Sequence, residues 1–193
     1  MASGIRLIVG LGNPGSRYVG TRHNAGHWFV EELAQRYNGS WREEARFKSR
    51  VCEINVNSHK LWLLAPQTFM NHSGDAVGTF ARYYRIPVDE ILVAHDELDL
   101  LPGRVKLKQG GGAAGHNGLR DTTQKLGSPD YLRLRLGIGH PGKQSAVVNF
   151  VLKRPPEAEM TLIRSATEHA AGHISDIIQG DMQTAMNALH SHS

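Results

Sequence analysis

Five polar side chains that could take part in catalysis lie in loops that follow apolar, strand-like runs. They are Asn13, His23, Asn71, Asp96 and Asn117. A histidine with a carboxylate, and no evident serine or cysteine nucleophile, suggests general-base activation of water. Asparagine amides offer a donor and an acceptor without charge, which suits both an oxyanion and a carbonyl group. Spacing alone does not show that these loops meet, and loop histidines are often only solvated.

The first glycine-rich loop allows a second interpretation. Gly10, Gly12 and Gly15 match the spacing of a dinucleotide-binding fingerprint, in which the last glycine opens directly into a helix. Here Pro14 disfavours helical geometry in the residue before it. The first clear helical pattern begins only after Asn24, which we expect to act as its N-cap. The interrupted helix argues against a nicotinamide oxidoreductase.

Metal and phosphate sites have partial signals. His23 and His27 are four residues apart, as metal ligands on a helix would be, but no third ligand lies in register and Gly26 weakens a helix there. The glycines at 110–112 could cradle a phosphate, yet no Lys-Ser/Thr pair follows them. We therefore predict no metal site, and a mobile lid or a nucleic-acid contact at this second glycine-rich loop.

Strand-like and helical segments alternate along the chain, which predicts a single α/β layered domain over residues 1–193 around a mixed sheet. The charged segment 41–48 reads as solvated surface, and both arginines of the run 132–136 as outward-facing. A helix from Glu157 should bury a stripe from Leu162 to Ile178 and end at Gly180. Strands are predicted at 7–9, 50–56, 60–65, 91–95, 104–108 and 132–136, and further helices after 24, before 86, at 119–126 and near 182–189.

Composition narrows the class of protein. The 193 residues include 22 basic and 18 acidic side chains, for a net charge of +4, which is compatible with a polyanionic partner but weak evidence for one. Cys52 is the only cysteine, so no internal disulfide can form and a reducing compartment is expected. No signal-peptide pattern and no apolar run of the roughly 20 residues that span a bilayer is visible. We expect a cytoplasmic protein with no membrane association.

Six sequence blocks in a fixed order are similar to the bacterial peptidyl-tRNA hydrolase family. Together they extend from near residue 5 to near residue 155, and the terminal helices fit as well. Six ordered blocks are a far more specific signal than any single motif. The blocks are Gly-Leu-Gly-Asn-Pro-Gly at 10–15, Thr-Arg-His-Asn-Ala-Gly at 21–26, Thr-Phe-Met-Asn-His-Ser-Gly at 68–74, Ala-His-Asp-Glu-Leu-Asp at 94–99, Gly-His-Asn-Gly-Leu at 115–119 and Leu-Gly-Ile-Gly-His-Pro at 136–141.

The resemblance implies a fold, an activity and a partner. The fold would be a monomeric three-layer α/β/α sandwich around a twisted mixed sheet, acting without metal or cofactor. The reaction would be hydrolysis of the ester between a peptide and the 3′ ribose of tRNA, which recycles tRNA released from ribosomes. The partner would be peptidyl-tRNA, bound at its 3′ CCA end and acceptor stem.

The resemblance also implies roles by motif match. His23 would be the base that deprotonates water, Asp96 would orient it, and Asn13 would distinguish blocked from free aminoacyl groups. The glycine-rich loop has Ala113 where the family often has histidine, so the gating or RNA contact of that loop is expected to differ. Residues implied in substrate binding are Tyr18, Phe69, Met70, Asn71, His116, Asn117, Lys108 and Arg135.

One further alternative is a non-catalytic RNA-binding module that uses the same basic strand faces. It predicts tRNA binding without turnover. The presence of both His23 and Asp96 favours the enzyme.

Overall fold

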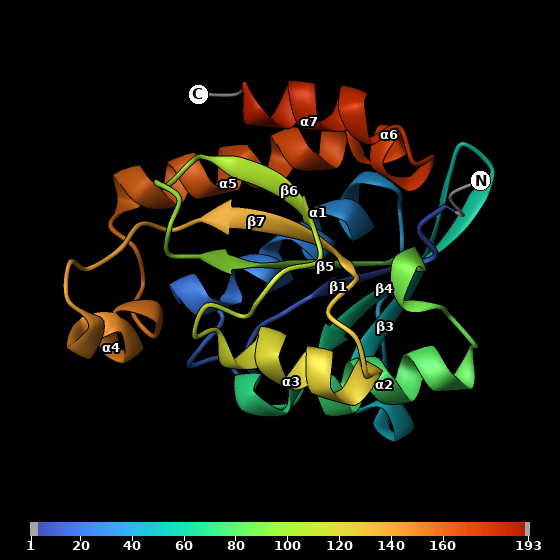
Figure 1. Cartoon of the computed structure of the whole chain (residues 1–193), viewed down its shortest axis with the longest axis horizontal. Helices are drawn as coiled ribbons and strands as arrows, with labels where there is room; N and C mark the ends of the chain where they lie inside the picture. Colours follow the sequence, from blue (N-terminus) through green and yellow to red (C-terminus); the bar gives the residue numbers. More distant parts are fainter. Residues whose placement is uncertain (1–3, 192–193) are drawn as a thin grey trace.

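The computed structural model describes residues 4–191, which are arranged around one seven-stranded sheet (Figure 1). The strand order is β2-β3-β4-β1-β5-β7-β6, so the N-terminal strand lies at the centre of the sheet. The strands are β1 (Leu7–Gly10), β2 (Arg42–Glu44), β3 (Ser49–Val56), β4 (His59–Pro66), β5 (Ile91–Glu97), β6 (Val105–Gln109) and β7 (Leu132–Gly137).

The sheet is mixed, as predicted. The central strands β4, β1, β5 and β7 are parallel, and the outer pairs β2–β3, β3–β4 and β6–β7 are antiparallel. Loops that leave the parallel strands therefore gather at one edge of the sheet, where ligands bind in open α/β folds. Asp96 lies two residues past the last β1–β5 pair, Gly10 with Ala94.

Helices cover both faces of the sheet (Figure 1). Alternate residues of β1 show why: Ile8 packs into the core under α1, α5, α6 and α7, whereas Leu7 and Val9 pack into the core under α2 and α3. This confirms the expected three-layer α/β/α arrangement. The helices are α1 (Ala25–Arg36), α2 (Ser73–Tyr83), α3 (Asn117–Leu126), α4 (Val147–Val151), α5 (Glu157–Gly172), α6 (Ile174–Ile178) and α7 (Met182–His190).

Two glycines allow the first helix to lie directly against the ends of the central strands. A Cβ at Gly10 would collide with the carbonyl oxygen of Gly26, and a Cβ at Gly26 would collide with the carbonyl oxygen of Ala94. Close approach of backbone is a common reason for glycine. Gly10 thus serves packing, and no helix starts at Gly15, so the dinucleotide fingerprint is absent.

Two sequence-based expectations about the elements are wrong, and a third is incomplete. The charged side chains of segment 41–48 are at the surface, as predicted, but the segment also contains β2, which pairs with β3 at the edge of the sheet, followed by a short 3₁₀ turn. Leu162 is 51% exposed because it precedes Ile163 by one position and lies off the buried stripe of α5. The predicted long helix also stops at Gly172, a poor helix former, and resumes as α6.

In residues 4–191 no helix combines the length and the apolar character that a bilayer crossing requires.

Candidate active site

A cleft of about 540 Å³ opens at the carboxyl ends of the parallel strands. All of the predicted site residues line it, so the structure confirms that these loops converge. They come from the β1–α1 loop, the segment after β4, the end of β5, the strands β6 and β7, and the start of α3. The predicted residues in its wall are Asn13, Tyr18, His23, Phe69, Met70, Asn71, Asp96, Lys108, His116, Asn117 and Arg135.

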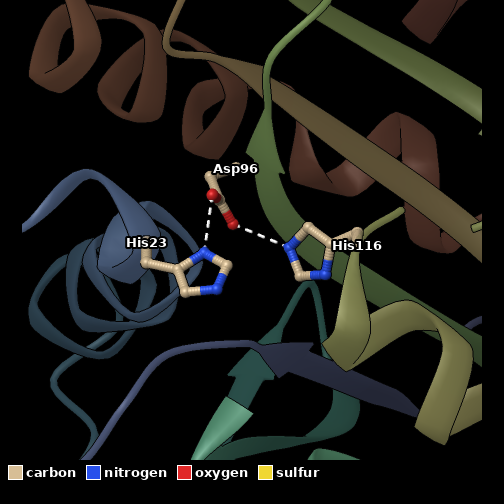
Figure 2. Close-up of side chains that lie close together, drawn as sticks. All are labelled: His23, Asp96 and His116. Atoms are coloured by element: carbon tan, nitrogen blue, oxygen red, sulfur yellow. Dashed lines mark hydrogen bonds and ion pairs between the residues drawn. The ribbon is translucent and has the colours of Figure 1, made fainter. Parts of the chain in front are cut away.

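The centre of the cleft is a carboxylate held between two imidazoles (Figure 2). Nδ1 of His23 lies 2.7 Å from Oδ2 of Asp96, and Nε2 of His116 lies 2.8 Å from Oδ1. Asp96 is buried at 3% exposure, while both rings reach the cleft. His23 comes from a 3₁₀ turn before α1, Asp96 from the end of β5, and His116 from the N-cap of α3.

The hydrogen bonds determine where the protons of these rings lie. Nδ1 of His116 accepts from the backbone N–H of Leu119 at 3.3 Å, so Nε2 of His116 carries the proton and donates to Asp96. The other carboxylate oxygen accepts from Nδ1–H of His23. Neutral His23 therefore has its lone pair on Nε2, which is the arrangement that a general base requires.

The electrostatic interaction between His23 and Asp96 favours the charged form of both side chains. Burial of the His23 ring lowers its pKa, but attraction to Asp96 and the hydrogen bond between them outweigh burial, and the net pKa is raised above 6.5. Burial alone would raise the pKa of Asp96. The two facing histidines reverse that effect and hold the pKa of Asp96 well below its usual range. Asp96 is consequently a permanent anion at neutral pH.

Asn13 is fixed by a second asparagine. The side-chain oxygen of Asn24 accepts from the backbone N–H of Asn13 at 2.9 Å, and its amide donates to the backbone carbonyl of Asn13 at 3.0 Å. Asn24 is the N-cap residue of α1, as predicted, but its side chain clamps the first loop and makes no cap bond to the helix. Oδ1 of Asn13 accepts from the backbone N–H of Met70 at 2.7 Å. The NH₂ end of Asn13 is thus the end that can donate to a substrate.

The other predicted binding residues form the rim and walls of the cleft. Asn71 and Asn117 are exposed. Tyr18 and Phe69 meet edge to face with ring centroids 6.0 Å apart, and Phe69 is 55% exposed. Met70 is buried beneath them at the junction with the core. Two amides and an aromatic pair beside an apolar wall suit a peptide backbone or a nucleobase.

The basic side chains of β6 and β7 are predicted to face outward, and one of them does not. Lys108 on β6 is exposed, and Arg135 on β7 is half-buried with its Nε 2.8 Å from Oε1 of Glu97. Arg133, predicted to point into solvent, is only 2% exposed. Its guanidinium donates to the carbonyl oxygens of Gly111 and Gly112 and stacks over Tyr131. The glycine-rich loop folds over this face of β7, which buries Arg133.

Sequence reasoning missed the wall that α4 forms. This short helix lies apart from the main body (Figure 1), and Val148, Val151 and Leu152 line the cleft. It is attached through Arg22, whose Nη1 donates to the carbonyl oxygen of Phe150 at 2.9 Å and whose guanidinium lies 3.8 Å from the Phe150 ring centroid. The apolar run 147–152 was visible in the sequence, but nothing in it showed that the run faces the cleft.

The structure separates the two histidines that resembled a helical metal pair. Nε2 of His27 lies 3.2 Å from the carbonyl oxygen of Pro66, away from the carboxylate of Asp96. Among residues 4–191, the set with spacing suited to a metal ion is His23, Asp96 and His116. No serine, threonine or cysteine occurs among the residues that line the cleft in the described chain.

This chemistry defines a class of protein. A carboxylate-held histidine with a free Nε2, facing amide donors in a cleft whose described lining has no serine, threonine or cysteine, is typical of a hydrolase that activates water. Comparison with known proteins then identifies the family. The family model for peptidyl-tRNA hydrolase matches residues 7–193. The chain therefore belongs to the peptidyl-tRNA hydrolase family.

Individual relatives are similar to this chain over almost its whole length. A peptidyl-tRNA hydrolase of Pectobacterium atrosepticum is 54% identical, with 98% of this chain and 97% of that protein covered. One of Halorhodospira halophila is 50% identical over 96% of both chains. The crystal structure of peptidyl-tRNA hydrolase from Acinetobacter baumannii superposes with a TM-score of 0.97 at 45% identity, covering 100% of this chain and 98% of that one. The family and fold expected from the six blocks are confirmed.

Proposed function

We propose that this chain cleaves its substrate by general-base catalysis, with His23 as the base. Membership of the family makes the chain a hydrolase of peptidyl-tRNA that recycles tRNA for translation. The bond concerned is the ester between the peptide and the 3′ ribose. The proposal concerns how the residues of the cleft break that bond.

The observation that carries the proposal is the tautomer of His23. Its Nδ1–H is committed to Asp96, and its Nε2 lone pair is left for a water molecule in the cleft. As Nε2 takes a proton from water, the oxygen attacks the ester carbonyl and the ring becomes an imidazolium facing Asp96. General-base assistance of this kind contributes roughly 10²–10⁴ in rate.

The tetrahedral intermediate needs a donor for its oxyanion. The NH₂ of Asn13 suits this role because the two bonds from Asn24 and the bond from Met70 leave that end of the amide as its available donor. One preorganised donor is worth about 10²–10³ in rate. Collapse of the intermediate then breaks the bond to the ribose 3′ oxygen, which takes the proton from Nε2 of His23 and restores the neutral base.

Substrate binding divides between the rim and the strands. Asn71 and Asn117 would hydrogen-bond the peptide backbone or the tRNA terminus. The aromatic pair Tyr18 and Phe69, with Met70 below it, would support the group next to the ester. His116 would act through Asp96, which it holds in place by its second hydrogen bond.

The tRNA body would lie against the basic strands. Lys108 and Arg135 border the cleft on β6 and β7 and would contact phosphates of the 3′ CCA end and acceptor stem. We further propose that residues 1–193 act as a single domain, as a monomer in the cytoplasm, and without a metal or cofactor.

The test is peptide release from N-acetyl-aminoacyl-tRNA with EDTA present, comparing wild type with His23→Ala. We expect the wild type to turn over and the variant to lose at least about 10²-fold in kcat while tRNA binding is retained. Circular dichroism controls for folding. If the variant keeps more than about a tenth of the wild-type kcat, the assignment of His23 fails.

The same assay decides the alternative of a non-catalytic RNA-binding module. That alternative predicts tRNA binding by the wild type with no release of peptide. The buried His23–Asp96 pair favours turnover, because a surface that only binds phosphate has no use for a buried carboxylate beneath a histidine.

A further inference from the structure

We propose that His23, Asp96 and His116 also form a binding site for a divalent transition-metal ion such as Zn²⁺, and that the bound ion inhibits the enzyme. The ion would be an inhibitor and no part of the reaction. The inhibitory consequence rests on the proposed role of His23 as the base, whereas binding of the ion does not.

The three side chains supply a two-nitrogen, one-oxygen ligand set. Their ligand atoms all lie within 4.8 Å of one another, and each ring nitrogen already contacts one carboxylate oxygen, at 2.7 and 2.8 Å (Figure 2). Tetrahedral Zn²⁺ takes such ligands at about 2.0–2.2 Å, which places ligand atoms about 3.4 Å apart. The two rings must therefore move toward each other, and the carboxylate must recede slightly.

The site is accessible from the cleft and selects among ions. The side chains of His23 and His116 are 14% and 11% exposed, and all three residues line the cleft. Imidazole ligands favour Zn²⁺, Co²⁺, Ni²⁺ and Cu²⁺, whereas Mg²⁺ and Ca²⁺ prefer oxygen ligands. The Mg²⁺ that accompanies tRNA is thus not expected to occupy it.

Coordination would reverse both tautomers. A metal on Nδ1 of His23 uses the lone pair there, so the neutral ring must carry its proton on Nε2, where it can no longer accept one from water. His116 must likewise move its proton from Nε2 to Nδ1, and the bond from Leu119 N–H is lost. Starting from neutral rings, the protons only change nitrogen and none is released, whereas a protonated His23 must release one proton when the ion binds. The enzyme loses its base, and the N-terminus of α3 loses a cap.

Loss of the hydrogen bond from Leu119 N–H to His116 distinguishes this site from metal binding by other histidines. Amide exchange of Leu119 should accelerate when the ion binds, because its N–H no longer has His116 as acceptor. An ion bound elsewhere, for example near the half-buried His169 and His173 with ring centroids 4.8 Å apart, would leave amide exchange at Leu119 unchanged.

Two titrations test the proposal. In the first, Co²⁺ is added to the free protein, and binding is followed by visible absorption and by amide hydrogen exchange at Leu119. In the second, Zn²⁺ is added to peptide-release assays at constant Mg²⁺. We expect one Co²⁺ to bind per protein molecule, Zn²⁺ to inhibit peptide release, and EDTA to restore it. His116→Asn retains an oxygen that can cap α3 and removes the Nε2 ligand, so the dissociation constant for Co²⁺ should rise at least about tenfold.

His173→Ala is the matched control, since it disrupts the pair of His169 and His173. Co²⁺ binding at the cleft and inhibition by Zn²⁺ should be the same in this variant as in the wild type. Absence of Co²⁺ binding by the wild type, unchanged affinity in His116→Asn, or loss of the site in His173→Ala would each overturn the proposal. The role of His23 as base is judged separately by His23→Ala without added metal, so the two proposals fail by different results.

Discussion

At the scale of single residues, Asp96 determines the state of the cleft. It is buried, it is kept ionised by two imidazoles, and it decides which nitrogen of His23 is free. A buried carboxylate without such partners would be strongly disfavoured. The same carboxylate thus leaves Nε2 of His23 free, and it leaves Nδ1 of His116 free to accept from the N-terminus of α3.

Asp96→Asn should impair the base in two ways. Without the carboxylate the imidazolium is no longer stabilised, so kcat should fall by at least about 10²-fold with a smaller change in KM. The base must be neutral to work, and burial alone lowers the pKa of His23. The acid limb of the kcat–pH profile should therefore move to lower pH than in the wild type.

Measuring kcat from pH 5 to pH 9 for both proteins checks this prediction. An unchanged kcat together with an unchanged acid limb would show that Asp96 does not act on His23.

At the scale of elements, α4 is attached to the turn that carries His23 by the side chain of Arg22. Arg22 is buried, it donates to the carbonyl oxygen of Phe150, and its own backbone N–H donates to the carbonyl oxygen of Lys153 at 3.1 Å. Val148 borders the cleft and is 69% exposed, whereas Val151 packs into the core. The η1 turn (Arg22–Asn24) therefore supplies the polar attachment of this wall of the cleft, beside the apolar contact of Val151.

Arg22→Met should loosen this wall. Loss of a charge-assisted hydrogen bond costs roughly 1.5–3 kcal/mol, which corresponds to roughly ten- to hundredfold faster amide exchange in α4. Exchange in β5 should be unchanged. Arg36→Met, which removes an exposed ion pair with Glu32 and a hydrogen bond to the backbone carbonyl oxygen of Glu168, is the control and should leave α4 protected. Equal exchange in α4 of wild type and Arg22→Met would contradict the anchoring role.

The basic strands should act on binding and leave the chemistry intact. Lys108→Ala should raise KM for full-length peptidyl-tRNA with little change in kcat, and should flatten the salt dependence of binding by about one unit of slope. Arg135→Ala should do the same to a smaller extent, because Glu97 already neutralises part of the charge of Arg135.

A minimal ester that lacks the tRNA body provides the comparison, since both variants should cleave it like wild type. Arg46→Ala, an exposed cation outside the cleft, should leave the salt slope unchanged. Equal losses on both substrates would place Lys108 in the chemistry or in the scaffold.

At the scale of the whole molecule, burial of neutral histidines couples stability to pH. His27 packs against Gly12 and donates to the carbonyl oxygen of Pro66; burial, aided by repulsion from Arg50, lowers its pKa to about 4. The unfolded chain titrates this group near 6.5, so it binds more protons than the folded protein between about pH 6.5 and pH 4. The free energy of unfolding should therefore fall as pH drops through that window.

His27→Gln removes the titration and retains an amide donor. Its free energy of unfolding should depend less on pH between 6.5 and 4, by up to about 3 kcal/mol across the window. Urea unfolding at several pH values measures this, and His72→Gln on the surface serves as the control. Parallel curves for wild type and His27→Gln would refute the assignment.

The sequence by itself determined most of the elements and the set of residues that meet at the cleft. Most strands, most helices and the α/β class follow from hydrophobic periodicity, which depends on neighbours along the chain. The six ordered blocks identified the family and the set of candidate site residues, and every one of those residues lines the cleft. The roles of the individual side chains remain predictions.

The tertiary structure decided which groups meet and which charges are buried. It showed that Asp96 serves two histidines, that Asn24 clamps Asn13 and makes no cap bond to α1, and that Arg133 lies under the glycine-rich loop. Hydrogen-bond partners and burial are set by segments far apart in sequence; His23 and Asp96, for example, are 73 positions apart. Local patterns carry no record of such contacts, because they form only when the sheet brings the loop ends to one edge.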